Sequence, residues 1–190
     1  IFKILLKHKN SSLLILVFLL SVLIVNPMGN FPLNDDWTYG KSVLNYFLYN
    51  NYHIGTSSST LWTHLMWGLL FTKFFGFSFF ILRVSTLISS LLGVWILFQL
   101  ILKISKNAQL ALLAAFVLLF NPIYFNLSNT YMTDVNFNTL FVLCLYFSFK
   151  FYENKRVLDF VFVFLISLFL VLIRQFGIII PLCFTFSMLF

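Results

Sequence analysis

The sequence predicts an all-α membrane protein, a polytopic transmembrane helical bundle of about six spans whose long extracytoplasmic first loop carries interfacial helices. The first observation is composition: 61% of the 190 residues are hydrophobic and 9% are charged, whereas soluble domains are about half apolar and about a quarter charged. The second is a series of apolar runs that approach or exceed the roughly 18 residues needed to cross a bilayer. Together they exclude a soluble globular domain.

The apolar runs define the order of the predicted elements. Spans are expected at about 11–28, 79–102, 108–125, 136–150, 157–173 and from 176 onward. We expect one domain over 1–190, with the first span in 1–28, the outer loop in 29–78 and the further spans in 79–190. Because the chain begins without Met and stops within an apolar run, we expect it to be the N-terminal part of a longer protein.

The outer loop contains a second apolar segment, LWTHLMWGLLFTKFFG from Leu61, which is too short to span and predicts an interfacial or re-entrant helix. The positions of Lys and Arg support this, because these residues are in excess in cytoplasmic loops. If 61–73 lies in the interface, eight of the twelve basic residues are cytoplasmic and four are outside. If it spans, the split is six and six. The count favours the interfacial helix.

The net charge of +7 raises the question of nucleic-acid binding. Nucleic-acid-binding proteins gather Lys and Arg on one solvated face, whereas here the basic residues lie in small groups between apolar runs. This distribution is typical of membrane topology signals, so we expect the membrane as a partner and no nucleic acid.

The predicted topology brings four ionisable residues to the outer membrane surface. Asp35 and Asp36 lie in the first outer loop, Asp134 follows the third span and Arg174 follows the fifth. Ionisable groups are costly to desolvate at a membrane and usually face a cavity or a partner. A structural reading stays open for each one: either of Asp35 and Asp134 would serve as a helix N-cap, and Arg174 would reach the headgroups.

The two other acidic residues, Glu153 and Asp159, are predicted on the cytoplasmic side. Asp159 stands four residues after Lys155, a spacing that predicts an ion pair on a helix surface. Neither residue needs a functional role.

The outer group suits transfer from a lipid phosphate to an acceptor. A carboxylate can act as a general base toward an attacking hydroxyl or amine, and arginine offers a planar fork of donors to a phosphate. We therefore take Asp35, Asp36 and Asp134 as candidate catalytic residues and Arg174 as the candidate ligand of the donor phosphate.

The same loop contains aromatic and imidazole side chains that suit sugar or acceptor contacts, because sugar rings stack on aromatic faces. The candidates are Trp37, Tyr39, His53 and His64. A metal site that joins His64 to Asp35 or Asp36 lacks any supporting ligand spacing, and an interfacial or hydrogen-bonded histidine is the simpler reading. The sequence assigns no metal and no cofactor, and a divalent metal requirement stays open.

These features occur in a recognisable order. An acidic pair follows the first span, then W-x-x-x-x-W-G-L-L-F-x-K-x-F-G-F-S-x-x-x-L-R, then MTDV after the third span and RQFG from Arg174. Over about residues 12 to 182 the chain resembles the N-terminal half of the GT-C-fold membrane glycosyltransferases that use polyprenyl-phosphate sugars. These include the dolichyl-phosphate-mannose protein mannosyltransferases and the bacterial lipid A aminoarabinose transferases.

The resemblance implies a role for each outer residue. Asp35 matches the acid that activates the acceptor, Asp36 stands where the family has Glu, Asp134 matches the acid of the second outer loop, and Arg174 matches the basic residue near the donor phosphate. The family's KPP element is absent before the interfacial segment, where SSST stands instead.

We therefore expect a glycosyltransferase that moves a sugar from a polyprenyl-phosphate donor to an acceptor on the extracytoplasmic face. The Phe, Ile, Asn and Lys usage is typical of an AT-rich genome, so we expect a bacterial plasma membrane. A transporter or flippase for a lipid-linked sugar, or a non-catalytic membrane scaffold, stays as an alternative. The sequence specifies neither the sugar nor the acceptor.

Overall fold

The computed structural model describes residues 2–33, 35–51 and 61–188, and every regular element within them is a helix. The prediction of an all-α protein is therefore confirmed for these residues. In chain order the elements are α1 (Phe2–Val25), α2 (Asp36–Tyr49), α3 (Trp62–Phe75), α4 (Phe79–Ser105), α5 (Ala108–Leu119), α6 (Pro122–Ser128), α7 (Thr133–Asn154), α8 (Val157–Val171), the 3-10 helix η1 (Gln175–Ile178) and α9 (Ile179–Phe186).

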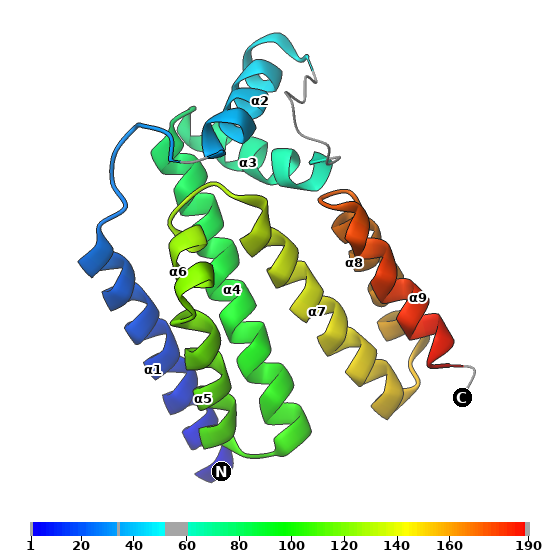
Figure 1. Ribbon diagram of the computed structural model, residues 1–190. Helices are drawn as coiled ribbons and strands as arrows, with labels where there is room; N and C mark the ends of the chain where they lie inside the picture. The colour runs from blue at the N-terminus through cyan, green and yellow to red at the C-terminus, as the bar shows by residue number, and fades with distance from the viewer. Residues whose placement is uncertain (1, 34, 52–60, 189–190) are drawn as a thin grey trace.

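The other helices run side by side and form a bundle, and α2 and α3 cover one end of it (Figure 1). The connection between α6 and α7 and the one between α8 and η1 lie at this covered end. The N-terminus, the α4–α5 turn and the α7–α8 turn lie at the opposite end. The connections thus alternate between the two ends as the sequence predicts, and below we call the end with α2 and α3 the capped end.

Six membrane spans are not confirmed. By length and composition, α4 is the one described helix that could cross a membrane, and a bent α5–α6 pair would make two. The apolar part of α1 over Lys9–Val25 and helix α8 are each shorter than 18 residues. Helix α7 is long enough, but it carries Asn136, Asn138 and Thr139 near its start.

The predicted span 108–125 is divided into α5 and α6, which meet at an angle of 67°. Pro122 causes the break, because proline has no backbone N–H and cannot continue a helix from the preceding turn. Asn121 starts the new helix: its side-chain oxygen accepts hydrogen bonds from the backbone N–H groups of Ile123 at 3.0 Å and Tyr124 at 3.1 Å. The same two residues that end α5 therefore start α6.

The two helices of the capped end agree with the sequence. Helix α2 covers DWTYGKSVLNYFLY and ends at Asn50, whose φ of 52° is left-handed. Helix α3 has 14 residues, too few to span a membrane, and ends at Gly76 with φ 79°. A small apolar cluster joins both helices to the bundle; its buried members are Val43, Leu65, Leu69, Leu82 and Tyr131.

Gly68 of α3 allows this close packing. A Cβ atom at this position would collide with the hydroxyl group of Tyr131. The glycine in the WGLLF segment therefore lets Tyr131, in the connection that leads into α7, pack closely against α3.

Acidic residues at the opposite end pair with lysine, but not as the sequence predicts. Asp159 pairs with Lys150 at 3.1 Å and not with Lys155. The prediction was wrong because α7 ends at Asn154 and Lys155 has a left-handed φ of 51°, so Lys155 and Asp159 do not share one helix. Glu153 forms an ion pair with Lys103 of α4.

Candidate functional site

Arg174 and Asp134 form an ion pair at the capped end. The guanidinium Nη1 lies 3.0 Å from Asp134 Oδ1, and each side chain is 36% exposed. Arg174 also donates from Nε and Nη2 to the hydroxyl of Thr133, at 3.1 and 2.7 Å. Asp134 lies in the first turn of α7, while Met132 is the N-cap, so the pair with Arg174 replaces the capping role considered above.

The backbone around Arg174 is held against α3 and α8. The Thr63 hydroxyl donates to the carbonyl of Phe169 at 2.9 Å, and the Thr63 N–H donates to the carbonyl of Leu172 at 3.3 Å. Gly177 packs η1 onto the end of α8, because a Cβ there would lie 2.6 Å from the backbone nitrogen of Val171. The RQFG segment thus fixes the direction from which the guanidinium reaches α7.

The phenol of Tyr39 in α2 is influenced by the charges of Asp35 and of this ion pair. Burial raises the pKa of Tyr39, the positive charge of Arg174 lowers it, and the negative charges of Asp35 and Asp134 raise it further. Its hydroxyl also interacts with the side chain of Thr133. Asp35, Asp134 and Arg174, which the sequence separates widely, therefore all lie within electrostatic reach of one phenol.

The two residues of the acidic pair have different environments. Asp35 is exposed at the N-cap position of α2, where its side chain makes no capping hydrogen bond. Asp36 is fully buried and accepts hydrogen bonds from the backbone N–H groups of Leu33 and, at 3.5 Å, Tyr131. Burial raises the pKa of Asp36, and those hydrogen bonds and the charge of Arg83 oppose the rise. Asp35 is therefore exposed to the surroundings, whereas Asp36 holds the loop before α2 and the α6–α7 connection together.

Arg83, near the start of α4, binds the backbone of the segment that precedes the acidic pair. It is 1% exposed and donates to the carbonyls of Pro27 and Gly29, both at 3.2 Å, and to that of Phe31. Its guanidinium carbon lies 4.8 Å from the centroid of the Phe31 ring. These contacts fix the segment that leads into Asp35 and Asp36.

His64 is buried and does not reach the surface of the site. It is 1% exposed, its ring stacks on Tyr131 with centroids 4.1 Å apart, and its Nδ1 lies 2.7 Å from Asn136 Nδ2. Tyr131 donates its hydroxyl to the His64 carbonyl at 2.7 Å. Burial lowers the pKa of His64 to about 3, so the imidazole is neutral at pH 7. The structure favours the hydrogen-bonded reading of His64 over a direct ligand contact.

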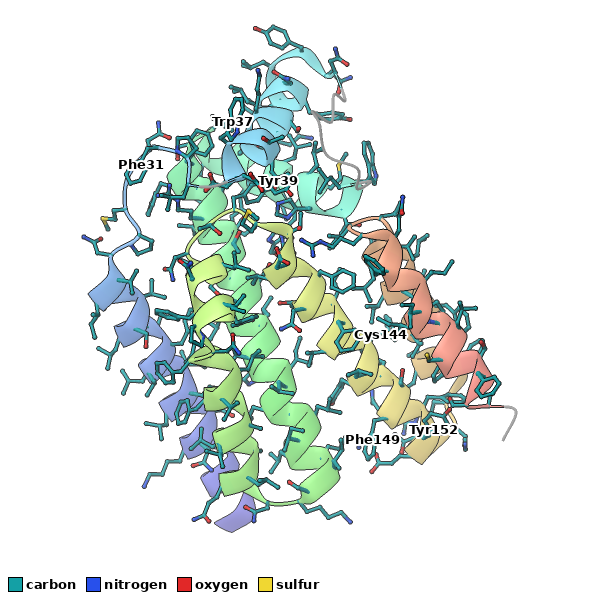
Figure 2. The ribbon with its side chains drawn as sticks, viewed as in Figure 1. Phe31, Trp37, Tyr39, Cys144, Phe149 and Tyr152 are labelled. Carbon is teal, nitrogen blue, oxygen red and sulfur yellow. The ribbon has the colours of Figure 1, made fainter. Side chains whose placement is uncertain are left out.

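The remaining candidates differ in their placement. Trp37 is 53% exposed, with the ammonium of Lys41 5.6 Å from its ring centroid, and Figure 2 shows Trp37 and Tyr39 together at the capped end. His53 lies outside the described residues. Within the described part of the chain, no group of three His, Cys, Asp or Glu side chains could hold a metal ion.

The arrangement can combine three chemical tasks at one surface. Asp35 offers an exposed carboxylate, Arg174 offers a cation for an anionic group, and Trp37 and Tyr39 offer aromatic faces. The supporting roles of Arg83, Tyr131, Thr133 and Asn136 were not predicted from the sequence. Arg83 carried a usable signal, a single arginine in an apolar helix, since such residues have buried partners. The other three carried none, because their partners come from distant segments.

A comparison with protein families gives an independent result. Residues 61–190 match the family model of the dolichyl-phosphate-mannose-protein mannosyltransferases. Neither the curated proteins nor the solved structures include a match to the chain. The matched segment covers α3 to the end of the chain and so includes Asp134 and Arg174, while the acidic pair of α2 precedes it. The chain belongs to the dolichyl-phosphate-mannose-protein mannosyltransferase family, whose members are integral membrane glycosyltransferases that use a dolichyl-phosphate sugar.

Proposed function

We propose that this protein transfers mannose from a polyprenyl-phosphate donor to an acceptor on the extracytoplasmic side of the membrane, at the capped end of the bundle. One observation carries the proposal. The exposed carboxylate of Asp35 and the Asp134–Arg174 ion pair come from three separate segments, and the charges of all three residues act on the Tyr39 phenol. Family membership supports the donor class, and the geometry supports the location.

Asp35 acts as the general base. It takes the proton of an acceptor hydroxyl while the hydroxyl oxygen attacks C1 of the sugar. The bond from C1 to the phosphate oxygen breaks, its electron pair stays on that oxygen, and polyprenyl phosphate leaves. The exposure of Asp35 lets the acceptor approach from outside the bundle.

Arg174 stabilises the phosphate that gains charge in this step. A guanidinium has five N–H donors, and three contacts of Arg174 go to Asp134 and Thr133. Further donors remain for phosphate oxygens, and 36% exposure leaves room for a ligand. Asp134 orients the guanidinium, and Trp37 and Tyr39 contact the sugar or the acceptor.

The proposal that the site lies on the extracytoplasmic side rests on the distribution of Lys and Arg along the bundle. The end opposite the site contains Lys103, Lys106, Lys150, Lys155 and Arg156, in the two short connections and the helix ends beside them. Cytoplasmic loops have an excess of such residues. The capped end is accordingly extracytoplasmic, and we place the protein in a bacterial plasma membrane on the basis of composition.

The test uses membranes that contain the protein and a radiolabelled polyprenyl-phosphate mannose. We expect label in the protein or lipid fraction with the wild type, and loss of transfer with Asp35→Asn and with Arg174→Gln. Glu153→Gln is the matched control, because it removes the same charge as Asp35→Asn at the opposite end. Full transfer by Asp35→Asn would contradict the assignment of the base, and no transfer by folded wild type would contradict the proposed function.

A further inference from the structure

We propose that a groove between α1, α4 and α7, toward the end opposite the capped end, binds an anionic phospholipid of the membrane leaflet at that end. The groove has a cavity volume of about 500 Å³, within the range of ligand sites. Trp95 lines it and is 40% exposed, so the groove opens at the surface of the bundle. This site is separate from the capped end and does not depend on the proposed transfer of mannose.

The residues along the groove change from apolar to polar to basic on two neighbouring helices. Helices α4 and α7 lie side by side, and both run from the capped end to the opposite end (Figure 1). On each helix an apolar lining residue is followed three positions later by a polar lining residue and seven positions later by a lysine. The two series are Ile96, Gln99 and Lys103 on α4, and Leu143, Tyr146 and Lys150 on α7. These spacings place each series on one face of its helix, so the groove is layered in the same order as a phospholipid.

The polar layer of the groove has no internal partner. The Ser11 hydroxyl of α1, the Gln99 amide and the Tyr146 hydroxyl line one cavity, and none has a side-chain hydrogen bond to another described residue. All three residues are only partly exposed. Hydrocarbon offers such groups no hydrogen bond, so leaving them unpaired within a membrane costs free energy. The ester carbonyls of a phospholipid would accept hydrogen bonds from them.

The depth of this polar layer also suits a phospholipid. Gln99 and Tyr146 each precede the lysine of their helix by four residues, which is about 6 Å along a helix axis. In a phospholipid the glycerol esters likewise lie just below the phosphate. A phosphate between Lys103 and Lys150 therefore places the esters beside Gln99 and Tyr146, with an acyl chain against the apolar residues beyond.

Both lysines retain donors for a phosphate. Lys103 pairs with Glu153, and Lys150 pairs with Asp159 at 3.1 Å. An ammonium has three N–H donors, and the two lysine side chains are 28% and 31% exposed. The ammonium of Lys150 lies 5.3 Å from the ring centroid of Phe147, which lines the groove. The cations are thus at the groove and are held there by carboxylates of α7 and α8.

Positive charge exceeds negative charge around the polar end of the groove. Lys106, Lys155 and Arg156 are exposed at the same end of the bundle and form no ion pair within the described part of the chain. Basic pockets between transmembrane helices bind anionic headgroups, and each basic residue near the membrane surface adds to this attraction. A zwitterionic headgroup has its own cation and gains less. The site therefore favours a headgroup with net negative charge, such as phosphatidylglycerol.

The experiment uses the protein in phosphatidylcholine nanodiscs that contain a phosphatidylglycerol with a photoreactive diazirine in one acyl chain, followed by mass spectrometry of the labelled peptides. A phosphatidylcholine with the same photoreactive chain is the comparison probe. The first variant is Gln99→Leu, which removes a polar group from the groove without leaving a protein partner unpaired. Its matched control is Gln109→Leu, at an exposed position near the start of α5 and outside the groove.

A second pair of variants tests the charge. Lys103→Gln combined with Glu153→Gln removes the ammonium together with its carboxylate, so the net charge is unchanged and no unpaired carboxylate remains. The control is Arg156→Gln, which removes a full positive charge at the same end but outside the residues that line the groove.

We expect phosphatidylglycerol to label the α4 and α7 peptides of the groove at least about fivefold more than phosphatidylcholine, the effect of one basic residue on an anionic lipid. Gln99→Leu should lower this labelling about threefold, the effect of one lost hydrogen bond. The Lys103–Glu153 double variant should reduce the preference for phosphatidylglycerol. Gln109→Leu and Arg156→Gln should change neither result.

Three outcomes would overturn the proposal. Equal labelling by the two probes would exclude a site for an anionic headgroup. Labels spread over all helices, or equal losses in Gln99→Leu and Gln109→Leu, would exclude the groove. An equal loss of preference in Arg156→Gln and in the double variant would assign the effect to general surface charge. Mannose transfer is not a readout of this experiment, so these outcomes leave the proposed function standing.

Discussion

The acidic residues at the two ends of the bundle differ in whether they form ion pairs. At the end with the α4–α5 and α7–α8 turns, Glu153 and Asp159 each pair with a lysine. At the capped end, Asp134 pairs with Arg174, whereas Asp35 and Asp36 have no ion pair among the described residues. Stability alone favours the first pattern. An exposed carboxylate without an ion pair among the described residues is available to a ligand, and this is consistent with the site that we propose at the capped end.

The contrast is sharpest between the neighbours Asp35 and Asp36, and their alanine variants should separate activity from stability. Asp35→Ala should lower kcat by about 10²–10⁴-fold, the usual contribution of a general base, without changing thermal stability. Asp36→Ala should destabilise the protein by about 1–3 kcal/mol, because it leaves the buried N–H of Tyr131 unpaired. Transfer assays and thermal unfolding in detergent measure both effects. The opposite assignment of the two effects would reverse our reading of the pair.

Arg83→Met should break the attachment of the capped end to the bundle. The change leaves the carbonyls of Pro27, Gly29 and Phe31 without their charged donor, and we expect a loss of about 3 kcal/mol. The control is Arg156→Met, at an exposed position in the α7–α8 turn, where we expect a change within about 0.5 kcal/mol. Equal effects on the unfolding temperature would show that the contacts of Arg83 do not stabilise the capped end.

His64 should make the capped end sensitive to acid. Its pKa is about 3 in the folded protein and 6.5 as the ordinary value, so below pH 6.5 the unfolded state binds more protons. Stability is therefore fully present above pH 6.5 and falls as the pH drops, by about 1.4 kcal/mol per unit at most. Thermal unfolding at pH 7 and pH 5 should show a loss of about 2 kcal/mol that His64→Gln removes. An unchanged slope in the variant would assign the sensitivity to other groups.

At low pH, Asp36 should make stability depend on pH with the sign opposite to that of His64. Burial raises its pKa above the ordinary value of 3.8, so the folded state binds more protons between the two values. Stability falls as the pH rises through that interval, and Asp36→Asn should remove this part of the profile. The double variant with His64→Gln tests whether the two contributions are separate.

Variants at the paired end should change stability alone, and the exposed ion pair should show the smallest effect. Glu153 is 40% exposed, so Glu153→Gln should change stability by less than about 1 kcal/mol. Asp159 is 3% exposed, so Asp159→Asn should cost more, about 1–3 kcal/mol, because Lys150 then loses a buried partner. Neither variant should alter mannose transfer. A loss of transfer in either would break the distinction between a structural end and a catalytic end.

Local patterns in the sequence were sufficient to predict that helices form at the capped end and roughly where they begin and end. The segment from Asp36 to Tyr49 forms α2, one helix of the outer loop in which the sequence predicts interfacial helices, and the short apolar segment after Leu61 forms α3. These features depend on neighbours within a few residues, which the printed sequence shows directly. The break at Asn121–Pro122 also has a local cause, but the long apolar run around it led us to predict one uninterrupted span.

Long-range partners could not be predicted in the same way. The sequence placed Asp134 and Arg174 at one end, and only the tertiary structure paired them across 40 positions. The sequence did not indicate that Asp36 would be buried against Tyr131 while Asp35 stayed exposed, because the two residues are identical in type and adjacent. The burial of Asp36 depends on Tyr131 in the α6–α7 connection, 95 positions away.

By itself, then, the sequence determined an all-helical membrane protein with a short helix at one end and a group of charges near it. Hydrophobic runs, prolines and caps act over one or two helical turns, so composition and order suffice for these features. The tertiary structure decided which carboxylate is exposed, what holds Arg83 and that Arg174 pairs with Asp134. Each of these depends on which distant helices pack together, and packing is a property of three-dimensional contact that no local pattern contains.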